Sequence, residues 1–253
     1  MDLRLPRLSV RIVQLALGIL VAVAPFPAKS ADCPEVLAKA RRLVLVTVED
    51  MASHHARLQR FTRDDPAGTW VADGAPEPAV VGQAGLAWGV DFPSRTESGE
   101  PEKREGDRRT PAGFYRLGQS FGFGPSKASG HLELKAGQTV CVDDPKSPHY
   151  NTIKPRSVIG ARTSGEDMRL IPLYRSGLLI DYPTDRESRR GSCIFVHIWK
   201  GPQAGTLGCV AMPEARVKAL QSFARDGDAV IGLLPVAALS RFGACLLGVT
   251  PSE

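Results

Sequence analysis

After its first thirty residues, the sequence lacks any apolar run that approaches the roughly 18 residues of a membrane-spanning helix. The remaining chain is therefore not expected to insert stably into a membrane. It also lacks internal repeats, low-complexity segments and an obvious linker, which predicts a single domain. No two cysteines have C-x₂-C spacing, so neither a zinc site nor any other metal or cofactor is indicated.

The sequence has little net charge once its N-terminal segment is set aside. The formal charge of the whole chain is +5, but residues 1–30 contribute +3 of it, which leaves +2 for residues 31–253. This balance gives no reason to expect nucleic acid as a partner. It is compatible with an anionic cell-wall polymer.

The N-terminal segment has the pattern of a secretory signal peptide. Three arginines precede the stretch from Ile12 to Ala24, in which only Gln14 is polar. Ala28 and Ser30 stand at the −3 and −1 positions of a cleavage before residue 31. We therefore predict a signal peptide over residues 1–30, with export to the periplasm or cell envelope, although an uncleaved anchor helix is the alternative.

Short apolar segments separated by Gly, Pro and Asp predict a mostly β chain with a few helices. Strands are expected within residues 43–48, 110–118, 139–144, 177–182, 191–199 and 229–235. Helices are expected after Asp32, which could cap the first, and from Pro213 to Gly227. The highly charged run over residues 97–109 is predicted to be an exposed loop. Both faces of the 191–199 segment are apolar, which predicts a central strand with His197 at its end.

The number of cysteines is odd. Cys33, Cys141, Cys193, Cys209 and Cys245 all follow the predicted signal peptide. Most cysteines of an exported protein form disulfides, so one thiol should remain free or pair with another chain.

His197 and Cys209 stand twelve positions apart and could form a base and its nucleophile. A core histidine and a disulfide cysteine are the plainer alternative. The segment GTLGC favours catalysis, because backbone N–H groups of such a turn can converge on an oxyanion and a following helix favours a thiolate. A histidine at the end of a rigid strand is well mounted as a general base.

The order of these residues separates families of cysteine enzymes. Papain-like peptidases place the cysteine before the histidine. Sortases have the order histidine, cysteine, arginine, which Arg216 would complete, but their histidine lies much farther upstream. The sequence instead resembles the L,D-transpeptidase catalytic domain of the YkuD type, in which a histidine precedes a [ST]-x-G-C block. His197 matches that histidine, Thr206, Gly208 and Cys209 match the block, and TPAGFY at 110–115 matches a second family motif.

The resemblance covers about residues 75–235 and implies a fold. The family has a mostly β (α+β) sandwich or barrel with a few short helices. We therefore expect residues 31–253 to form one domain whose catalytic core is about 75–235.

The resemblance also implies a reaction on peptidoglycan stem peptides. The Cys209 thiolate would attack the L-centre carbonyl at position three of a tetrapeptide stem and release D-alanine, with His197 as general base and acid. A second stem would give a 3→3 cross-link, and a protein lysine or water are other acceptors. Backbone N–H groups of Leu207, Gly208 and Cys209 would form the oxyanion hole, and Thr206 would shape the turn.

Further roles stay open at this stage. Trp199, Tyr150 and Asn151 are candidates for the substrate groove, or are core and turn residues. Leu207 replaces the family's second histidine and Ala211 replaces its polar residue two positions after the cysteine. A hydrolase of the same fold and an inactive wall-binding protein are therefore alternatives. Four cysteines allow three pairings, of which we favour Cys141–Cys193 and Cys33–Cys245. Nothing indicates the oligomeric state.

Overall fold

The computed structural model describes Met1 and residues 33–92, 97–126, 129–225 and 228–250. Apart from Met1, the predicted signal peptide over residues 1–30 lies outside the described residues, as does the predicted cap Asp32. No helix in the described part of the chain has the length and apolarity that crossing a membrane requires.

Two nearly continuous apolar segments from opposite ends of the chain pair as neighbouring strands of a barrel. β1 (Arg42–Val48) and β14 (Ala229–Pro235) lie parallel, and β1 also pairs with antiparallel β2 (His55–Thr62). Eight strands in the described ranges thereby close a ring in the order β1, β14, β6, β11, β12, β13, β4, β2. The remaining ring members are β6 (Thr110–Gly122), β11 (Ser176–Ile180), β12 (Phe195–Ile198), β13 (Val210–Met212) and β4 (Glu77–Val80). The expected mostly β barrel is confirmed, and its buried aliphatic and aromatic side chains form the main core.

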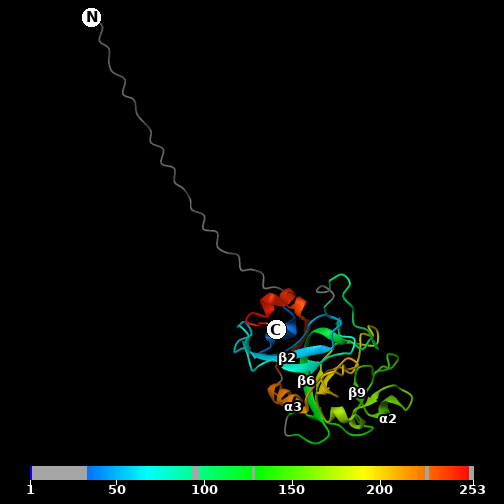
Figure 1. Cartoon of the computed structure of the whole chain (residues 1–253). Coiled ribbons are helices and arrows are strands. Elements are labelled where there is room, and N and C mark those ends of the chain that lie inside the picture. Colours follow the sequence, from blue (N-terminus) through cyan, green and yellow to red (C-terminus); the bar gives the residue numbers. More distant parts are fainter. Residues whose placement is uncertain (2–32, 93–96, 127–128, 226–227, 251–253) are drawn as a thin grey trace. The chain divides into compact units, whose positions relative to one another are not determined.

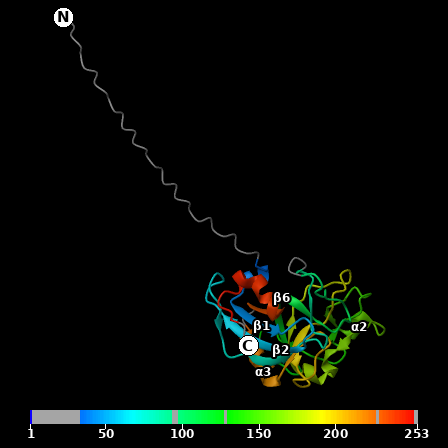
Figure 2. The same cartoon turned by 45° about the horizontal axis from the view of Figure 1, so that its top comes forward.

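Smaller elements surround the barrel. β3 (Val71–Ala72) pairs with β2, while β5 (Leu86–Trp88) and β7 (Leu132–Glu133) pair with β6. A separate three-stranded sheet contains β10 (Glu166–Asp167), β8 (Val140–Cys141) and β9 (Ile153–Lys154). In both cartoon views the yellow-green segment that carries α2 lies on one side of the molecule, away from the red C-terminal segment (Figures 1 and 2).

The helices are short. They comprise α1 (Glu35–Lys39), α2 (Arg156–Ile159), α3 (Glu214–Phe223) and the 3₁₀ segments η2 (Met168–Leu170), η3 (Pro172–Tyr174) and η4 (Val236–Cys245). α3 packs against β11 and β12. Pro34, rather than Asp32, occupies the position before α1 and provides no side-chain cap.

Two elements are shorter than their apolar patterns predict. The 191–199 segment forms a strand only over Phe195–Ile198, and the 139–144 segment only over Val140–Cys141. Cys193 has φ 56°, in the left-handed region that non-glycine residues rarely adopt. This bend ends the extended segment before β12, and hydropathy carries no signal for it.

The charged run over residues 97–109 is not simply an exposed loop, as the sequence predicted. Lys103 is only 2% exposed. Its ammonium donates hydrogen bonds to Asp107 at 2.6 Å and to the Arg104 carbonyl at 2.7 Å. Other carboxylates of the run pair with residues outside it, Glu100 with Arg241 and Glu102 with Arg190. Sequence charge alone does not distinguish such a turn from a solvated loop.

Two disulfides have the pairing favoured from the sequence. Cys33 bonds to Cys245 and Cys141 bonds to Cys193. The first ties the segment before α1 to the end of η4. The second ties β8 of the small sheet to the segment that leads into β12. Among the described cysteines, Cys209 is the one left free.

Candidate active site

Parallel pairing of β12 with β13 brings His197 and Cys209 to the same place. His197 is the register partner of Ala211, and Cys209 lies two residues before Ala211. Side chains two residues apart on a strand point to the same face. The short connection over residues 199–209 therefore places the thiol and the imidazole on one face, with the small side chain of Ala211 leaving room between them.

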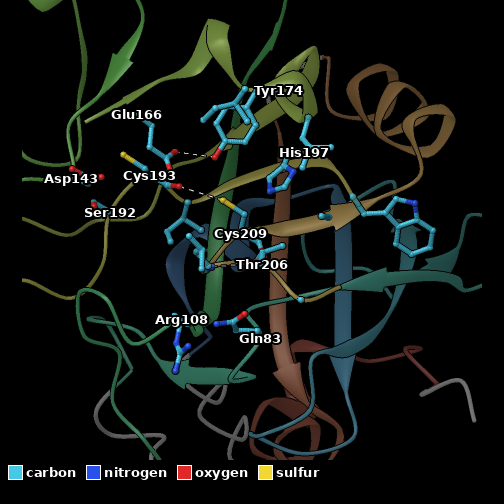
Figure 3. Close-up of a pocket in the computed structure, with 18 of the residues that line it drawn as sticks. Gln83, Arg108, Asp143, Glu166, Tyr174, Ser192, Cys193, His197, Thr206 and Cys209 are labelled. Atoms are coloured by element: carbon cyan, nitrogen blue, oxygen red, sulfur yellow. Dashed lines mark hydrogen bonds between the residues drawn. The ribbon is translucent and has the colours of Figure 1, made fainter. Parts of the chain in front are cut away.

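That face opens into a pocket of about 550 Å³ lined by His197, Cys209 and Ala211 together with the 204–208 loop. Figure 3 shows Cys209 below Tyr174 and beside His197, with Glu166 on one side of the pocket and Arg108 at its far end. A volume of this size accommodates several residues of a peptide.

The Cys209 thiol is buried and neutral. It is 7% exposed and belongs to a second apolar cluster outside the main core. Its S–H donates to the Cys193 carbonyl and its sulfur accepts from the Phe195 N–H, each at 3.4 Å. Burial, followed by the charge of Glu166, raises the pKa of Cys209 to about 12. The resting nucleophile is therefore a thiol.

His197 is equally buried and also neutral. Burial lowers its pKa to about 4. Its Nδ1–H donates to the Ile198 carbonyl at 2.8 Å when the proton is assigned to that nitrogen. This tautomer leaves Nε2 as an unprotonated acceptor, and no partner for Nε2 is found among the described residues. A neutral imidazole with a free Nε2 is the form that a general base requires.

The expected assistance from a helix dipole is wrong. Cys209 does not precede a helix directly, because β13 intervenes and α3 begins only at Glu214. The dipole effect falls off within the first helical turn. Burial therefore dominates the thiol's ionisation.

Two threonines hold the backbone at the nucleophile. The carbonyl oxygen of Cys209 accepts hydrogen bonds from Thr206 at 2.6 Å and from Thr110 at 3.2 Å. Thr206 also exchanges backbone hydrogen bonds with Val81 and Gln83, each at 2.8 Å. The loop that carries Cys209 is thus fastened to the end of β4 and to the start of β6.

The same loop decides which backbone N–H groups can receive an oxyanion. The Gly208 N–H donates to Thr206 Oγ1 at 3.1 Å and is therefore engaged. Within the described residues, no acceptor takes the N–H groups of Leu207 and Cys209. Of the three amides expected from the sequence, the structure leaves those of Leu207 and Cys209 available, whereas Gly208 is committed to the turn. Its φ of +153° also favours glycine at that position.

Tyr174, which no sequence motif indicated, lies directly beside both candidate catalytic residues. Its ring contacts that of His197 edge-on, with centroids 5.1 Å apart. Its hydroxyl donates to Glu166 at 2.9 Å, and its proximity to Cys209 lowers the pKa of the thiol against the larger opposing effect of burial. Burial raises the pKa of Glu166 above its ordinary value.

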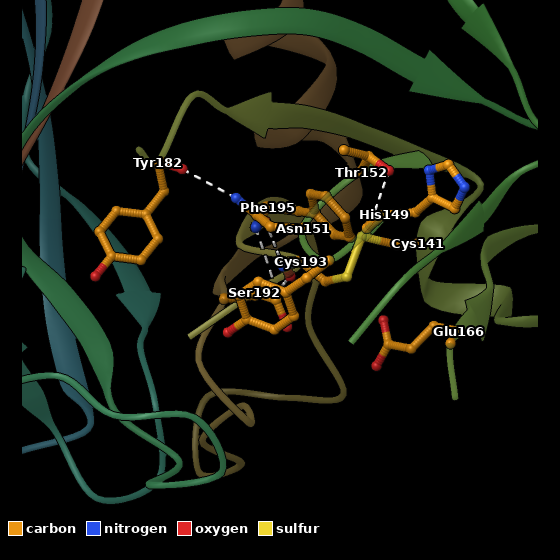
Figure 4. Close-up of a disulfide and its surroundings, with 12 residues drawn as sticks. Cys141, His149, Asn151, Thr152, Glu166, Tyr182, Ser192, Cys193 and Phe195 are labelled. Carbon is orange, nitrogen blue, oxygen red and sulfur yellow. Dashed lines mark hydrogen bonds between the residues drawn. A yellow bond between two sulfur atoms is a disulfide. The ribbon is translucent and has the colours of Figure 1, made fainter. Parts of the chain in front are cut away.

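The Cys141–Cys193 disulfide lies next to Asn151 (Figure 4), and the carbonyl of Cys193 accepts the hydrogen bond of the Cys209 thiol. Asn151 Oδ1 accepts from the Cys193 N–H at 3.0 Å, and its amide donates to the Tyr182 carbonyl at 3.0 Å. These contacts hold Cys193 in its left-handed conformation. They thereby aim its carbonyl at the Cys209 thiol.

The three residues expected to line the substrate groove differ in their positions relative to the pocket. Trp199 lines the pocket, whereas Tyr150 and Asn151 do not. The Tyr150 hydroxyl donates to Glu105, and the Asn151 side chain is occupied by Cys193 and Tyr182. Tyr150 and Asn151 therefore act on the walls of the pocket from outside it.

The pocket walls carry charges of opposite sign. Asp143 and Glu166 lie on one side near Cys193, and Arg108 lies at the other end (Figure 3). Glu105 also lines the pocket. Asp143 Oδ1 is buried without a hydrogen-bond partner in the described residues. No group of three metal-ligating side chains occurs in the described ranges, so the geometry offers no metal centre there.

Sequence reasoning missed Glu105, Asp143, Glu166 and Tyr174 for a common reason. They come from the 97–109 turn, the small sheet and η3, none of which carries a catalytic motif. Dense charge near the TPAGFY motif was the available signal for Glu105. Tyr174 had none, because only the tertiary fold places η3 over β12 and β13.

Comparisons with known proteins identify the family of the chain. A family model described as the L,D-transpeptidase catalytic domain, YkuD, matches residues 54–231. A search of curated proteins found no match.

Two solved structures are similar over about half their own length. Bd1075 from Bdellovibrio bacteriovorus is 18% identical, with 80% of this chain and 51% of that chain covered and a TM-score of 0.39. The helical cell shape determining protein Pgp2 from Campylobacter jejuni is 15% identical, with 78% and 48% covered and a TM-score of 0.39.

Proposed function

The chain belongs to the family of L,D-transpeptidase catalytic domains, and from that premise we propose that it is an exported cysteine acyltransferase acting on peptidoglycan stem peptides. The observation that carries the proposal is the meeting of an unpaired thiol, Cys209, and a neutral imidazole, His197, in one pocket. Free thiols are rare in exported proteins unless they react or bind.

The acylation step uses groups already in place. His197 Nε2 takes the thiol proton as the Cys209 sulfur attacks the carbonyl carbon at the L-centre of residue three in a tetrapeptide stem. The resulting oxyanion accepts hydrogen bonds from the N–H groups of Leu207 and Cys209. When the intermediate collapses, the C–N bond breaks, and D-alanine leaves with the proton held by His197. A thioester on Cys209 remains.

The second step regenerates the thiol. An acceptor amine attacks the thioester carbon, a C–N bond forms and the C–S bond breaks. The proton lost by the attacking nitrogen passes through His197 to the sulfur. A second stem as acceptor gives a 3→3 cross-link, and a protein lysine gives an attached protein.

The charges of the pocket support a stem peptide as substrate. The carboxylates of Glu105, Asp143 and Glu166 suit an ammonium group, and the guanidinium of Arg108 suits a carboxylate. A stem with meso-diaminopimelate at position three carries both groups. The partnerless Asp143 Oδ1 is satisfied when such an ammonium binds.

Hydrolysis of the thioester is the second candidate. Leu207 is 72% exposed beside the pocket, and Ala211 faces into it. Neither side chain offers a polar contact that would hold an acceptor peptide. Water would then resolve the thioester, and the protein would act as a carboxypeptidase or endopeptidase. A catalytically inactive protein that binds the cell wall is the third alternative.

Intact mass spectrometry tests the proposal. Wild-type protein and Cys209→Ala are each incubated with a tetrapeptide stem fragment. We expect a thioester-sized mass gain and release of D-alanine from wild type alone. Added stem or lysine amines should then discharge the adduct as amides, whereas hydrolysis in their presence favours the second candidate. If wild type shows no adduct and releases no D-alanine, both enzyme proposals are overturned.

A further inference from the structure

Tyr174 is held beside Glu166 and Cys209 by contacts on several sides. The residue is 5% exposed, and its ring packs edge-on against Phe195, with centroids 5.6 Å apart, as well as against His197. Its hydroxyl donates to Glu166 Oε2 at 2.9 Å. Figure 3 shows this bond directly above the Cys209 side chain. The ring is fixed, so its hydroxyl hydrogen is the part free to turn.

The same side chain also lies beside the nucleophile. Tyr174 and Cys209 belong to one apolar cluster and line one pocket. A hydrogen bond from Tyr174 would lower the pKa of Cys209 and favour the thiolate, whereas the charge of Glu166 raises that pKa. A phenol has one hydrogen to donate. The carboxylate and the sulfur therefore compete for it.

We propose that Tyr174 is a positioning residue that gives its single hydroxyl hydrogen to Glu166 in the resting enzyme and to the Cys209 sulfur once Glu166 loses its negative charge. Glu166 thereby adds to the effect of burial, which keeps the nucleophile in its neutral form. The inference deepens the proposed function and rests on it for biological meaning, since Cys209 must be the nucleophile for this control to matter.

The chemistry of the acceptors gives the direction of this exchange. A carboxylate is a far stronger acceptor than a thiol sulfur, so the hydrogen stays with Glu166 while Cys209 is protonated. Glu105 and Asp143 are acidic groups that act on Glu166, and both oppose its ionisation. Lys103 is the cation that acts on Cys209. Neutralising Glu166 removes the stronger acceptor and releases the hydrogen toward a thiolate.

A double-mutant cycle on thiol reactivity tests the inference. Glu166→Gln is made in the wild-type and Tyr174→Phe backgrounds, and alkylation of Cys209 by iodoacetamide is timed in the absence of substrate. In the wild-type background we expect Glu166→Gln to speed alkylation by about tenfold, corresponding to one pKa unit of the thiol. In the Tyr174→Phe background the gain should fall below about threefold, because only the change in charge remains.

Asp143→Asn is the matched control. It removes a neighbouring carboxylate of the same pocket that makes no hydrogen bond with Tyr174. Its effect on alkylation should be the same in both backgrounds. An equal gain from Glu166→Gln in both backgrounds would show that charge alone acts, and would overturn the inference.

A second substitution covers the case in which Glu166→Gln does not fold. Glu166→Asp keeps the charge but shortens the reach to Tyr174, so it should speed alkylation in the wild-type background and not with Tyr174→Phe. The alkylation assay needs no peptide substrate. If the effect of Glu166→Gln on alkylation depends on Tyr174 but no D-alanine is released, the proposed function is rejected and the role of Tyr174 is retained. If D-alanine is released but the effect of Glu166→Gln does not depend on Tyr174, the proposed function is retained and the role of Tyr174 is rejected.

Discussion

The hydroxyl of Thr110 donates a hydrogen bond to the carbonyl oxygen of Cys209 at 3.2 Å, although 99 residues separate them. Thr110 Oγ1 also accepts from the Gly82 N–H at 2.8 Å, and Thr206 donates to the same Cys209 carbonyl. The first residue of TPAGFY thus fixes the backbone of the TLGC segment. Two motifs that are distant in sequence form one support for the nucleophile.

Thr110→Val should damage the site more than its small change in volume suggests. It leaves the buried Gly82 N–H without its acceptor and removes one donor from Cys209, which should cost about 1–3 kcal/mol of unfolding free energy. The loosened loop should slow thioester formation by about 10- to 100-fold. Urea unfolding and adduct formation on a stem fragment measure the two effects.

Thr139→Val is the control for this substitution. Thr139 is also buried, and its hydroxyl bonds to the Lys135 carbonyl at 3.0 Å, outside the pocket. It should lose comparable stability with little change in the rate of adduct formation. Equal slowing by both variants would mean that Thr110 acts through global stability alone.

The alkylation rate of Cys209 should report an unusually weak acid. Burial raises the thiol's pKa to about 12. In the absence of substrate, the rate constant with iodoacetamide should rise about tenfold per pH unit up to pH 9 or beyond without reaching a plateau. The Cys209→Ala variant provides the blank. A plateau near pH 8 would contradict the neutral resting pair.

Acid should weaken the fold through His197. Its pKa is about 4 in the folded protein, against an ordinary value of 6.5, so the unfolded chain binds the proton more readily. This contribution to stability is present above pH 6.5 and is lost as pH falls toward 4, amounting to about 3 kcal/mol.

Urea unfolding across that range measures the effect. His197→Gln should show a flatter pH dependence than wild type. His55→Gln, at an exposed histidine, should keep the wild-type dependence. The prediction fails if His197→Gln and wild type lose the same stability between pH 6.5 and 4.

The two disulfides should have different effects on the thiol. Replacing Cys141 and Cys193 with alanine opens a loop of 52 residues, which should cost about 4 kcal/mol, and frees the Cys193 carbonyl that binds the thiol. Replacing Cys33 and Cys245 opens a loop of 212 residues and should cost about 5 kcal/mol. Thermal unfolding compares their stabilities.

Alkylation of the folded variants distinguishes a local effect on Cys209 from a general loss of stability. Only the Cys141 and Cys193 double variant should change the reactivity of Cys209, because its disulfide borders the pocket. A similar change in both double variants would indicate that general loosening, and not the position of Cys193, controls the thiol.

Local sequence predicted the elements that depend on local chemistry. The apolar segments at 43–48 and 229–235 form β1 and β14, and the apolar segment around His197 contains β12. The nucleophile and base candidates followed from residue type, from their order in the chain and from the match to a family motif. The odd number of cysteines was enough to indicate a free thiol.

Tertiary structure alone decided how those residues behave. The parallel register of β12 and β13 placed His197 and Cys209 on one face, and burial made both neutral. Tyr174 and Glu166 reached Cys209 from segments without any catalytic motif. Ionisation and hydrogen bonding depend on what surrounds a side chain within a few ångströms, and in this protein most of those neighbours come from distant parts of the chain.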